Sequence, residues 1–290
     1  MKQSSSVLGR LALLACTFLW GTSFVVLKNA LDDMPTLWIL AIRFSGAALL
    51  MMLFGIRRLR DLDFGYWKGG AVMGTLLAAA YIIQTYGLLY TTPGKNAFLT
   101  ATYCVLVPFL WWFFRRQKPE RSNLIAALIC FVGIGLVSLQ EHLTVNPGDL
   151  ITIFCGLFYG LHIIATSLNA ENRDPVLLSM VQFLTAAALC FLLAPLGAPF
   201  PAHVPADTWL SILYLCVMCT GVCFLLQTIG QKYTPPNEVA IFLTLESVFG
   251  AAISVLFFHE KLTLQVFCGF VLIFLAVLIS ETKPAIFRKK

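Results

Sequence analysis

Charged residues are scarce in this sequence. Asp, Glu, Lys and Arg make up 12% of its 290 residues, and apolar residues make up 59%. Soluble domains carry roughly 25% charged residues. So little charge cannot cover a surface in water, and the composition therefore excludes a soluble globular protein.

Long apolar runs fill the chain instead. A helix that crosses the hydrocarbon core of a bilayer needs about 20 mostly apolar residues. We therefore predict an all-α membrane protein with ten transmembrane helices, at residues 11–28, 35–54, 67–89, 96–114, 123–139, 149–168, 176–196, 209–229, 237–258 and 264–280. Two of the connections, after residues 89 and 229, are short enough to require tight helical hairpins.

Motifs for catalysis and cofactor binding are also missing. The sequence has no His-Glu-x-x-His, Gly-x-Ser-x-Gly or phosphate-binding P-loop pattern, so we expect neither an enzyme nor a cofactor. The longest connection between predicted spans, residues 197–208, leaves no room for a soluble domain. Cys216, Cys219 and Cys223 share a helical face without an accompanying His, Asp or Glu, and we read them as small buried residues rather than metal ligands.

Basic residues are unevenly distributed between alternate loops. If the N-terminus is cytoplasmic, that side collects sixteen Lys and Arg residues and the other side three, Lys28, Lys95 and Lys261. The positive-inside rule then predicts a multi-pass protein of the cell (inner) membrane with both termini in the cytoplasm. The net charge of +6 is thus a topology signal and does not indicate a nucleic-acid partner.

One phrase occurs twice. The segment QTYGLLYT begins at Gln84, and QTIGQKYT begins at Gln227. Further matches, such as Trp20 with Tyr159, keep an offset of 139 to 144 residues. We infer two five-helix repeats, residues 1–145 and 146–290. Because five is odd, the second repeat enters the membrane from the opposite side, so the repeats are inverted.

Two charged residues fall near the middle of predicted spans, Arg43 and Glu246. A charge at the centre of a membrane helix costs about 2.5 to 3.5 kcal/mol, so such residues face a cavity or a partner. They either form a buried ion pair that fixes packing, or bind substrate. In the second reading Arg43 attracts a carboxylate or phosphate, and Glu246 binds an ammonium group or a coupling proton.

Several segments together resemble a known family. They are WGTSF from Trp20, AIRF ending at Phe44, and LESVFGAAISVLFFHEKLT from Leu245. With ten spans in two halves, they resemble the drug/metabolite transporter (DMT) superfamily, in particular its EamA-type permeases. The resemblance implies a ten-helix transporter with a central cavity and peripheral fifth and tenth helices. Many relatives have LEP where this chain has LES, so we expect no proline kink in the ninth span.

Polar and aromatic residues complete the candidate site. Gln84 and Gln227 lie inside the membrane in both halves, where they either bond neighbouring helices or line a cavity. His162 is either a packing residue or a proton carrier. Four further residues stand on helices that line the cavity by resemblance: Trp20, Tyr81, Tyr103 and Asn96.

These features predict a secondary active transporter, a permease or exporter that works by alternating access. Its expected partners are the lipid bilayer, a coupling proton at Glu246, and a substrate that is a small metabolite, an amino-acid-like compound or a drug. We expect a monomer or a homodimer. The alternative functions are a membrane receptor or scaffold, and a channel without active transport.

Overall fold

The computed structural model describes residues 2–138, 147–258 and 263–282. These residues form helices joined by short turns, and they contain no strands. The first half of the chain contains α1 (Lys2–Ala30), α2 (Thr36–Gly55), the 3-10 helix η1 (Ile56–Asp61), α3 (Phe64–Tyr90), α4 (Pro93–Thr100), α5 (Tyr103–Arg115) and α6 (Arg121–Ser138). The second half contains α7 (Pro147–Ala170), α8 (Pro175–Gly197), α9 (Ala206–Cys216), the π-helix η2 (Val217–Val222), α10 (Cys223–Tyr233), α11 (Pro236–Leu243), α12 (Leu245–Phe258) and α13 (Leu264–Thr282).

Eight helical segments among the described residues are long and apolar enough to cross a membrane. They are Val7–Ala30, Thr36–Asp61, Phe64–Tyr90, Pro93–Arg115, Pro147–Ala170, Pro175–Gly197, Ala206–Tyr233 and Pro236–Phe257. The two other predicted spans, 123–139 and 264–280, correspond to α6 and α13. Their apolar stretches, Arg121–Gly133 and Phe267–Ala276, are shorter. The protein is therefore an all-α, multi-pass membrane protein, and the structure supports eight of the ten expected spans.

The hairpins after α3 and α10 form as the short connections require. Pro93 and Pro236 occupy the first turn of α4 and α11, where a missing backbone N–H costs nothing. Thr92 caps α4 through its side chain, which accepts a hydrogen bond from the Lys95 N–H. Each long hairpin thus reverses within a few residues.

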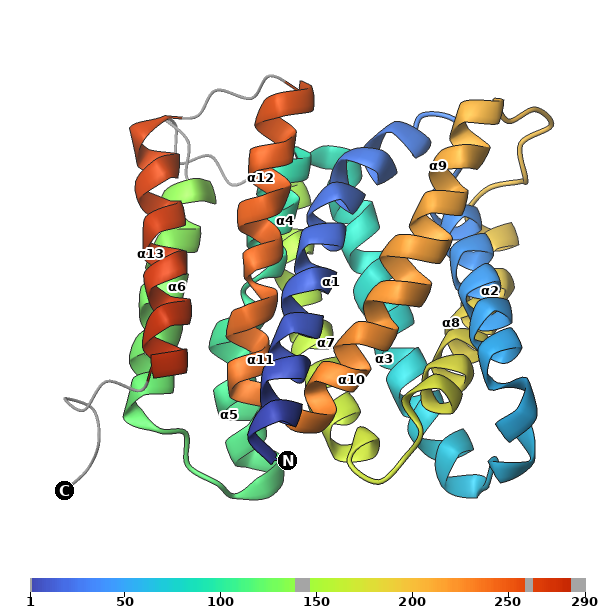
Figure 1. Ribbon diagram of the computed structural model, residues 1–290. Coiled ribbons are helices and arrows are strands. Elements are labelled where there is room, and N and C mark those ends of the chain that lie inside the picture. The colour runs from blue at the N-terminus through green and yellow to red at the C-terminus, as the bar shows by residue number, and fades with distance from the viewer. Residues whose placement is uncertain (1, 139–146, 259–262, 283–290) are drawn as a thin grey trace.

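The helices form one bundle, with α6 and α13 side by side at one edge and α2 and α8 at the other (Figure 1). Contacts between the two halves come in matched sets. Helix α1 packs on α10 and α12, and its counterpart α7 packs on the corresponding helices α3 and α5. In the same way, α11 packs on α5, and its counterpart α4 packs on α12. The interface is therefore built twice from equivalent elements. As the resemblance implied, α6 and α13 are peripheral.

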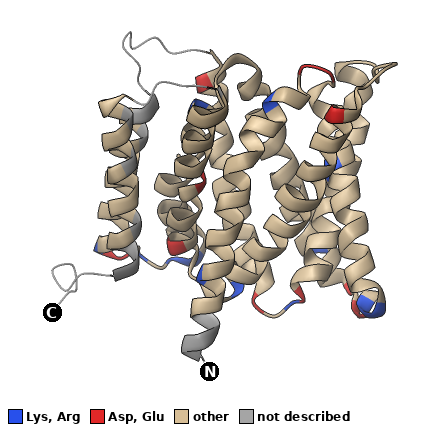
Figure 2. Ribbon diagram, turned by 45° about the horizontal axis from the view of Figure 1, so that its top comes forward, with Lys and Arg blue, Asp and Glu red and all other residues tan. Residues whose placement is uncertain are grey.

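The surface matches a lipid environment. Large apolar side chains are exposed along the outside of the bundle, among them Leu53, Leu128, Leu192, Leu210 and Leu256. Lys and Arg gather mainly at the end of the bundle where the N-terminus lies (Figure 2). A broad apolar belt with charged ends is the form that a bilayer selects.

The predicted ninth span is not continuous. Although the proline of the LEP pattern is absent, the helix is interrupted at Thr244, between α11 and α12. Two carbonyls at the break accept a hydroxyl in addition to a backbone N–H: Thr244 Oγ1 donates to the Ile241 carbonyl and Ser247 Oγ to the Thr244 carbonyl, both at 2.6 Å. Side-chain bonding of this kind bends helices without proline.

Small residues allow α3 to approach α8 closely. A Cβ atom added at Gly74 would overlap the main-chain oxygen of Gln182 and lie 2.7 Å from Thr185 Cβ. By contrast, a Cβ at Gly135 on α6 would meet nothing within 4 Å.

We therefore expect Gly74→Ala to lower the free energy of unfolding by about 1–3 kcal/mol through overpacking. Gly135→Ala is the matched control, and should be neutral or slightly stabilising because alanine favours helix. Thermal unfolding of the purified variants measures both. Equal effects of the two substitutions would contradict the close helix contact.

Candidate functional site

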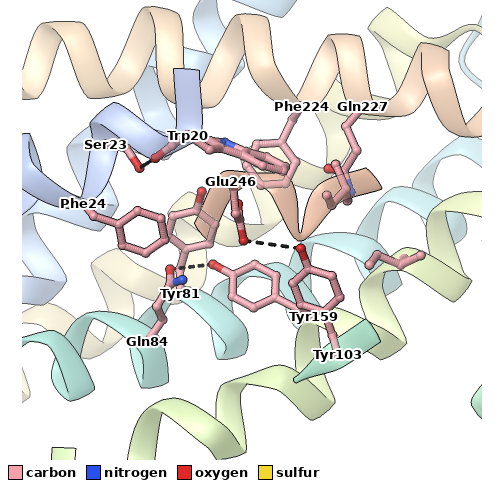
Figure 3. Close-up of a pocket in the computed structure, with 12 residues that line it drawn as sticks. Trp20, Ser23, Phe24, Tyr81, Gln84, Tyr103, Tyr159, Phe224, Gln227 and Glu246 are labelled. Atoms are coloured by element: carbon pink, nitrogen blue, oxygen red, sulfur yellow. Dashed lines mark hydrogen bonds between the residues drawn. The ribbon is translucent and has the colours of Figure 1, made fainter. Parts of the chain in front are cut away.

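A cavity lies at the centre of the bundle, between the two halves (Figure 3). Both halves supply its walls, through α1, α3 and α5 on one side and α7, α10, α11 and α12 on the other. Its lining residues are Trp20, Ser23, Phe24, Tyr81, Gln84, Tyr103, Tyr159, Ile163, Phe224, Gln227, Leu243 and Glu246.

The cavity is narrow in this conformation. Its volume is about 30 Å³. Ligand sites typically measure about 300–1,000 Å³. A metabolite-sized ligand thus requires the lining side chains or helices to move apart.

Two helix interruptions place the polar residues of the cavity. Tyr103 begins α5 directly after the break that follows α4, and Glu246 lies in the first turn of α12 after the break at Thr244. In both halves a threonine hydroxyl bonds a carbonyl three residues earlier: Thr102 to Leu99 (2.9 Å), and Thr244 as described. Non-helical backbone at membrane depth is tolerated where it lines a cavity.

Glu246 is the charged residue of this lining, and its side chain has few partners. It is 6% exposed, and its Oε1 accepts a hydrogen bond from the Tyr103 hydroxyl at 3.4 Å (Figure 3). Among the ion pairs found in the described residues, none involves Glu246. A carboxylate offers about four acceptor positions, so most of its capacity is left for other partners.

The two glutamines of the repeated phrase both line the cavity but differ in their bonding. The Gln84 side chain donates to Thr100 Oγ1 (2.8 Å) and accepts from the Tyr159 hydroxyl (2.7 Å). Gln227, 2% exposed, has a buried Oε1 atom without a hydrogen-bond partner. One glutamine is thus fixed by the protein, and the other has an unused acceptor.

Aromatic rings make up half of the lining. Trp20 and Phe224 meet edge to face with centroids 4.9 Å apart, and Tyr81 lies 5.7 Å from Tyr159 in the same manner. The indole N–H of Trp20 donates to the Cys219 carbonyl on η2 (2.8 Å). This bond holds the indole against a helix of the other half.

Arg43 does not line the cavity. It is fully buried behind Tyr81, with its guanidinium carbon 4.7 Å from the centre of that ring. Its Nε donates to Thr220 Oγ1, and its Nη2 donates to the Tyr81 hydroxyl and the Cys219 carbonyl, both at 3.3 Å. The structure thus brings Arg43 to the π-helix η2, and neither pairs it with Glu246 nor opens it to a ligand in the cavity.

Asn96 and His162 also lie outside the lining. Asn96 Nδ2 donates to the Gln84 carbonyl (3.1 Å) and to Thr152 Oγ1 (2.9 Å). His162 Nε2 lies 3.0 Å from Gln182 Oε1. Both residues support helices that carry lining residues. The described residues contain no group of three or more His, Cys, Asp and Glu that could hold a metal.

Sequence reasoning missed several lining residues, most notably Tyr159 and Phe224. The repeat itself carried the signal. Tyr159 is the equivalent of Trp20 at the offset of 139, and Phe224 is the equivalent of Tyr81 at 143. Transferring each candidate to its counterpart in the other half would have found both.

Interrupted helices that converge on a central cavity are typical of multi-pass membrane transport proteins. A model of the EamA-like transporter family matches this chain twice, over residues 7–139 and 146–282. The chain belongs to the EamA-like transporter family, and is thus a membrane transporter of the drug/metabolite type.

Relatives agree with this assignment. The chain is 32% identical to an uncharacterized transporter of Archaeoglobus fulgidus, covering 94% of this chain and 85% of the relative. It is 22% identical to the uncharacterized transporter YoaV of Bacillus subtilis, covering 91% and 93%. A solved crystal structure superposes with a TM-score of 0.79 over 97% of both chains at 16% identity. That likeness concerns the fold alone.

The unequal bonding of the two glutamines gives a test at matched positions. We expect Gln84→Met to lower the free energy of unfolding by about 1–3 kcal/mol, since it leaves the partly buried Tyr159 hydroxyl without its acceptor. Gln227→Met removes an unused acceptor and should not destabilise the ligand-free protein. Thermal unfolding without ligand compares them, and a larger loss for Gln227→Met would show that the bonding is assigned to the wrong glutamine.

Proposed function

We propose that this protein is a secondary active transporter that moves a small metabolite, an amino-acid-like compound or a drug through the central cavity by alternating access. The proposal includes ten spans, two inverted repeats at residues 1–145 and 146–290, and a cell-membrane location with both termini in the cytoplasm. One observation carries it: equivalent contacts close the two opposite ends of the bundle.

Glycine pairs form the first set of these contacts. At the end that carries the N-terminus, a Cβ on Gly230 of α10 would lie 2.9 Å from the Gly9 carbonyl oxygen of α1. At the other end, a Cβ on Gly87 of α3 would lie 3.0 Å from the Gly148 carbonyl oxygen of α7. Gly9 and Gly148 are 139 residues apart, and Gly87 and Gly230 are 143 apart. The repeat therefore builds the same closure twice.

Ion pairs form the second set, at the same offsets. Arg10 Nη2 lies 3.6 Å from Glu238 Oε2, and Lys95 Nζ lies 3.7 Å from Asp149 Oδ2. Arg10 lies on α1 and Glu238 at the start of α11, whereas Asp149 lies on α7 and Lys95 at the start of α4. Each pair thus joins the first helix of one half to the start of an interrupted helix of the other half. We call Arg10–Glu238 the inner latch and Lys95–Asp149 the outer latch. Breaking one latch while the other stays closed would expose the cavity to one side at a time.

Covalent closure of a latch tests the proposal. Eight of the nine cysteines are buried, and Cys268 is exposed, so a Cys268→Ser background suits selective labelling. We expect the pair Arg10→Cys with Glu238→Cys, bridged by a short bifunctional thiol reagent, to lose most counterflow in proteoliposomes and to regain it on reduction. The pair Lys95→Cys with Asp149→Cys should behave likewise, because a cycle needs both latches to open.

The single-cysteine variants, treated with the same reagent, are the controls. Undiminished counterflow in bridged protein would reject alternating access through these ends. A receptor or scaffold would show no counterflow before bridging, and a channel would pass ions continuously at rates far above those of a carrier.

Glu246 is the proposed proton-coupling residue. It is a buried carboxylate that faces the cavity and, among the described residues, has no basic ion-pair partner, so protonation would change the charge of the cavity wall. We expect an imposed pH gradient to drive accumulation of substrate into proteoliposomes, and a protonophore or Glu246→Gln to abolish it. Accumulation that survives Glu246→Gln would exclude this residue as the coupling site.

A further inference from the structure

Glu246 and Gln227 carry the unused acceptors of the cavity. Five lining donors have partners within the protein: Trp20 Nε1 with the Cys219 carbonyl, Ser23 with the Trp20 carbonyl, Gln84 Nε2 with Thr100, Tyr159 with Gln84, and Tyr103 with Glu246. The Tyr81 hydroxyl accepts from Arg43, and its own hydrogen and the Gln227 amide nitrogen remain available as donors. Gln227 Oε1 has no partner, and Glu246 receives a single long hydrogen bond.

Buried acceptors without donors are costly, and a buried carboxylate is more costly still. A ligand that offers N–H donors and a positive charge would supply what both groups lack. An anion would instead meet the Glu246 carboxylate, which repels it. The polar part of the cavity therefore favours an ammonium or a similar cationic group.

The remaining lining favours the same charge. The six rings of Trp20, Phe24, Tyr81, Tyr103, Tyr159 and Phe224 surround the carboxylate (Figure 3). The faces of aromatic rings attract cations through their quadrupole, and this attraction grows when water is excluded. The rings also provide an apolar wall for the body of the ligand.

Arg43 lies close to the cavity, and its positive charge would repel a cationic ligand. Its guanidinium is held by the Thr220 hydroxyl, the Cys219 carbonyl and the Tyr81 hydroxyl, and it lies against the face of Tyr81 outside the lining. A ligand in the cavity contacts Glu246 directly and is separated from Arg43 by the Tyr81 ring. The attraction of a cationic ligand to Glu246 is therefore stronger than its repulsion by Arg43.

We propose that the substrate is an organic cation, an amine or guanidine with an aromatic or apolar body, whose charged nitrogen binds Glu246 and Gln227. This assignment rests on the proposed function for its transport step. The binding step stands on the cavity alone.

Three probes share one phenyl-alkyl body and differ in charge: 2-phenylethylamine, phenylalanine and 3-phenylpropionate. Equilibrium binding to the purified full-length protein in detergent should rank them in that order, with no binding of the anion. Glu246→Gln should weaken binding of the amine about tenfold or more. Glu171→Gln, an acid on the exposed turn after α7, is the matched control and should change nothing.

Two further variants separate cation binding from a general loss of structure, with folding checked by thermal unfolding. Phe24→Leu should weaken the amine roughly two- to fivefold, whereas Phe109→Leu, on the exposed face of α5, should not. Arg43→Met should strengthen amine binding, because it removes a like charge. If Arg43 binds an anionic group, the same variant would weaken phenylalanine and 3-phenylpropionate.

The proposal is overturned if folded wild-type protein fails to bind the amine, if the anion binds as tightly as the amine, or if Glu246→Gln binds the amine as the wild type does. Counterflow of the amine, corrected for leak with protein-free liposomes, separates this proposal from the proposed function. Amine binding without counterflow would retain the ligand class and reject transport. Counterflow of phenylalanine or 3-phenylpropionate without amine binding would retain transport and reject the ligand class.

Discussion

The need to satisfy backbone polar groups in a medium without water governs this structure. Lipid-exposed helices cannot be interrupted, because each free N–H or C=O costs several kcal/mol. Within the described part of the chain, three spans are nevertheless interrupted, between α4 and α5, at η2, and between α11 and α12. All three lie at or directly behind the central cavity. At each one a side-chain hydroxyl bonds a backbone carbonyl: Thr102, Thr220 and Thr244 bond those of Leu99, Leu215 and Ile241.

This constraint also accounts for contacts of Arg43. The π-helix η2 turns the Cys219 carbonyl toward α1 and α2, where it accepts from both Trp20 and Arg43. Helices α1 and α2 belong to the first half, and η2 to the second. Arg43 is thus a fixed link across the interface of the halves, and Tyr81 lies between it and the cavity.

The repeated framework contains an unrepeated site. Trp20 and Tyr159, Tyr81 and Phe224, and Gln84 and Gln227 are equivalent pairs whose members all line the cavity. Glu246 corresponds to Thr102, and Arg43 corresponds to Gln182. Under the proposed alternating access, symmetry of the framework would let the two ends open by the same movement, and asymmetry in the lining would give a bound ligand one orientation.

The sequence predicted the helical class and the approximate spans, because length and apolarity are properties of the chain alone. It did not predict which way a side chain faces around its helix. In a membrane helix the lipid-facing and core-facing residues are both apolar, so no amphipathic stripe marks the inner face. Arg43 and Asn96 therefore appeared as cavity residues, although they lie behind it. The break at Thr244 was missed because hydroxyl groups, which leave no strong sequence mark, replace the proline.

The sign of the charges in the two latches follows from electrostatics. The first half supplies both bases, Arg10 and Lys95, and the second half both acids, Asp149 and Glu238. Each acid lies in the first turn of its helix, α7 or α11, where the helix dipole stabilises a negative charge. Because like charges repel, a latch can form only between halves and never within one. The halves therefore attract each other at both ends, and under the proposed alternating access a ligand that draws them together in the middle would shift the balance between the two latches.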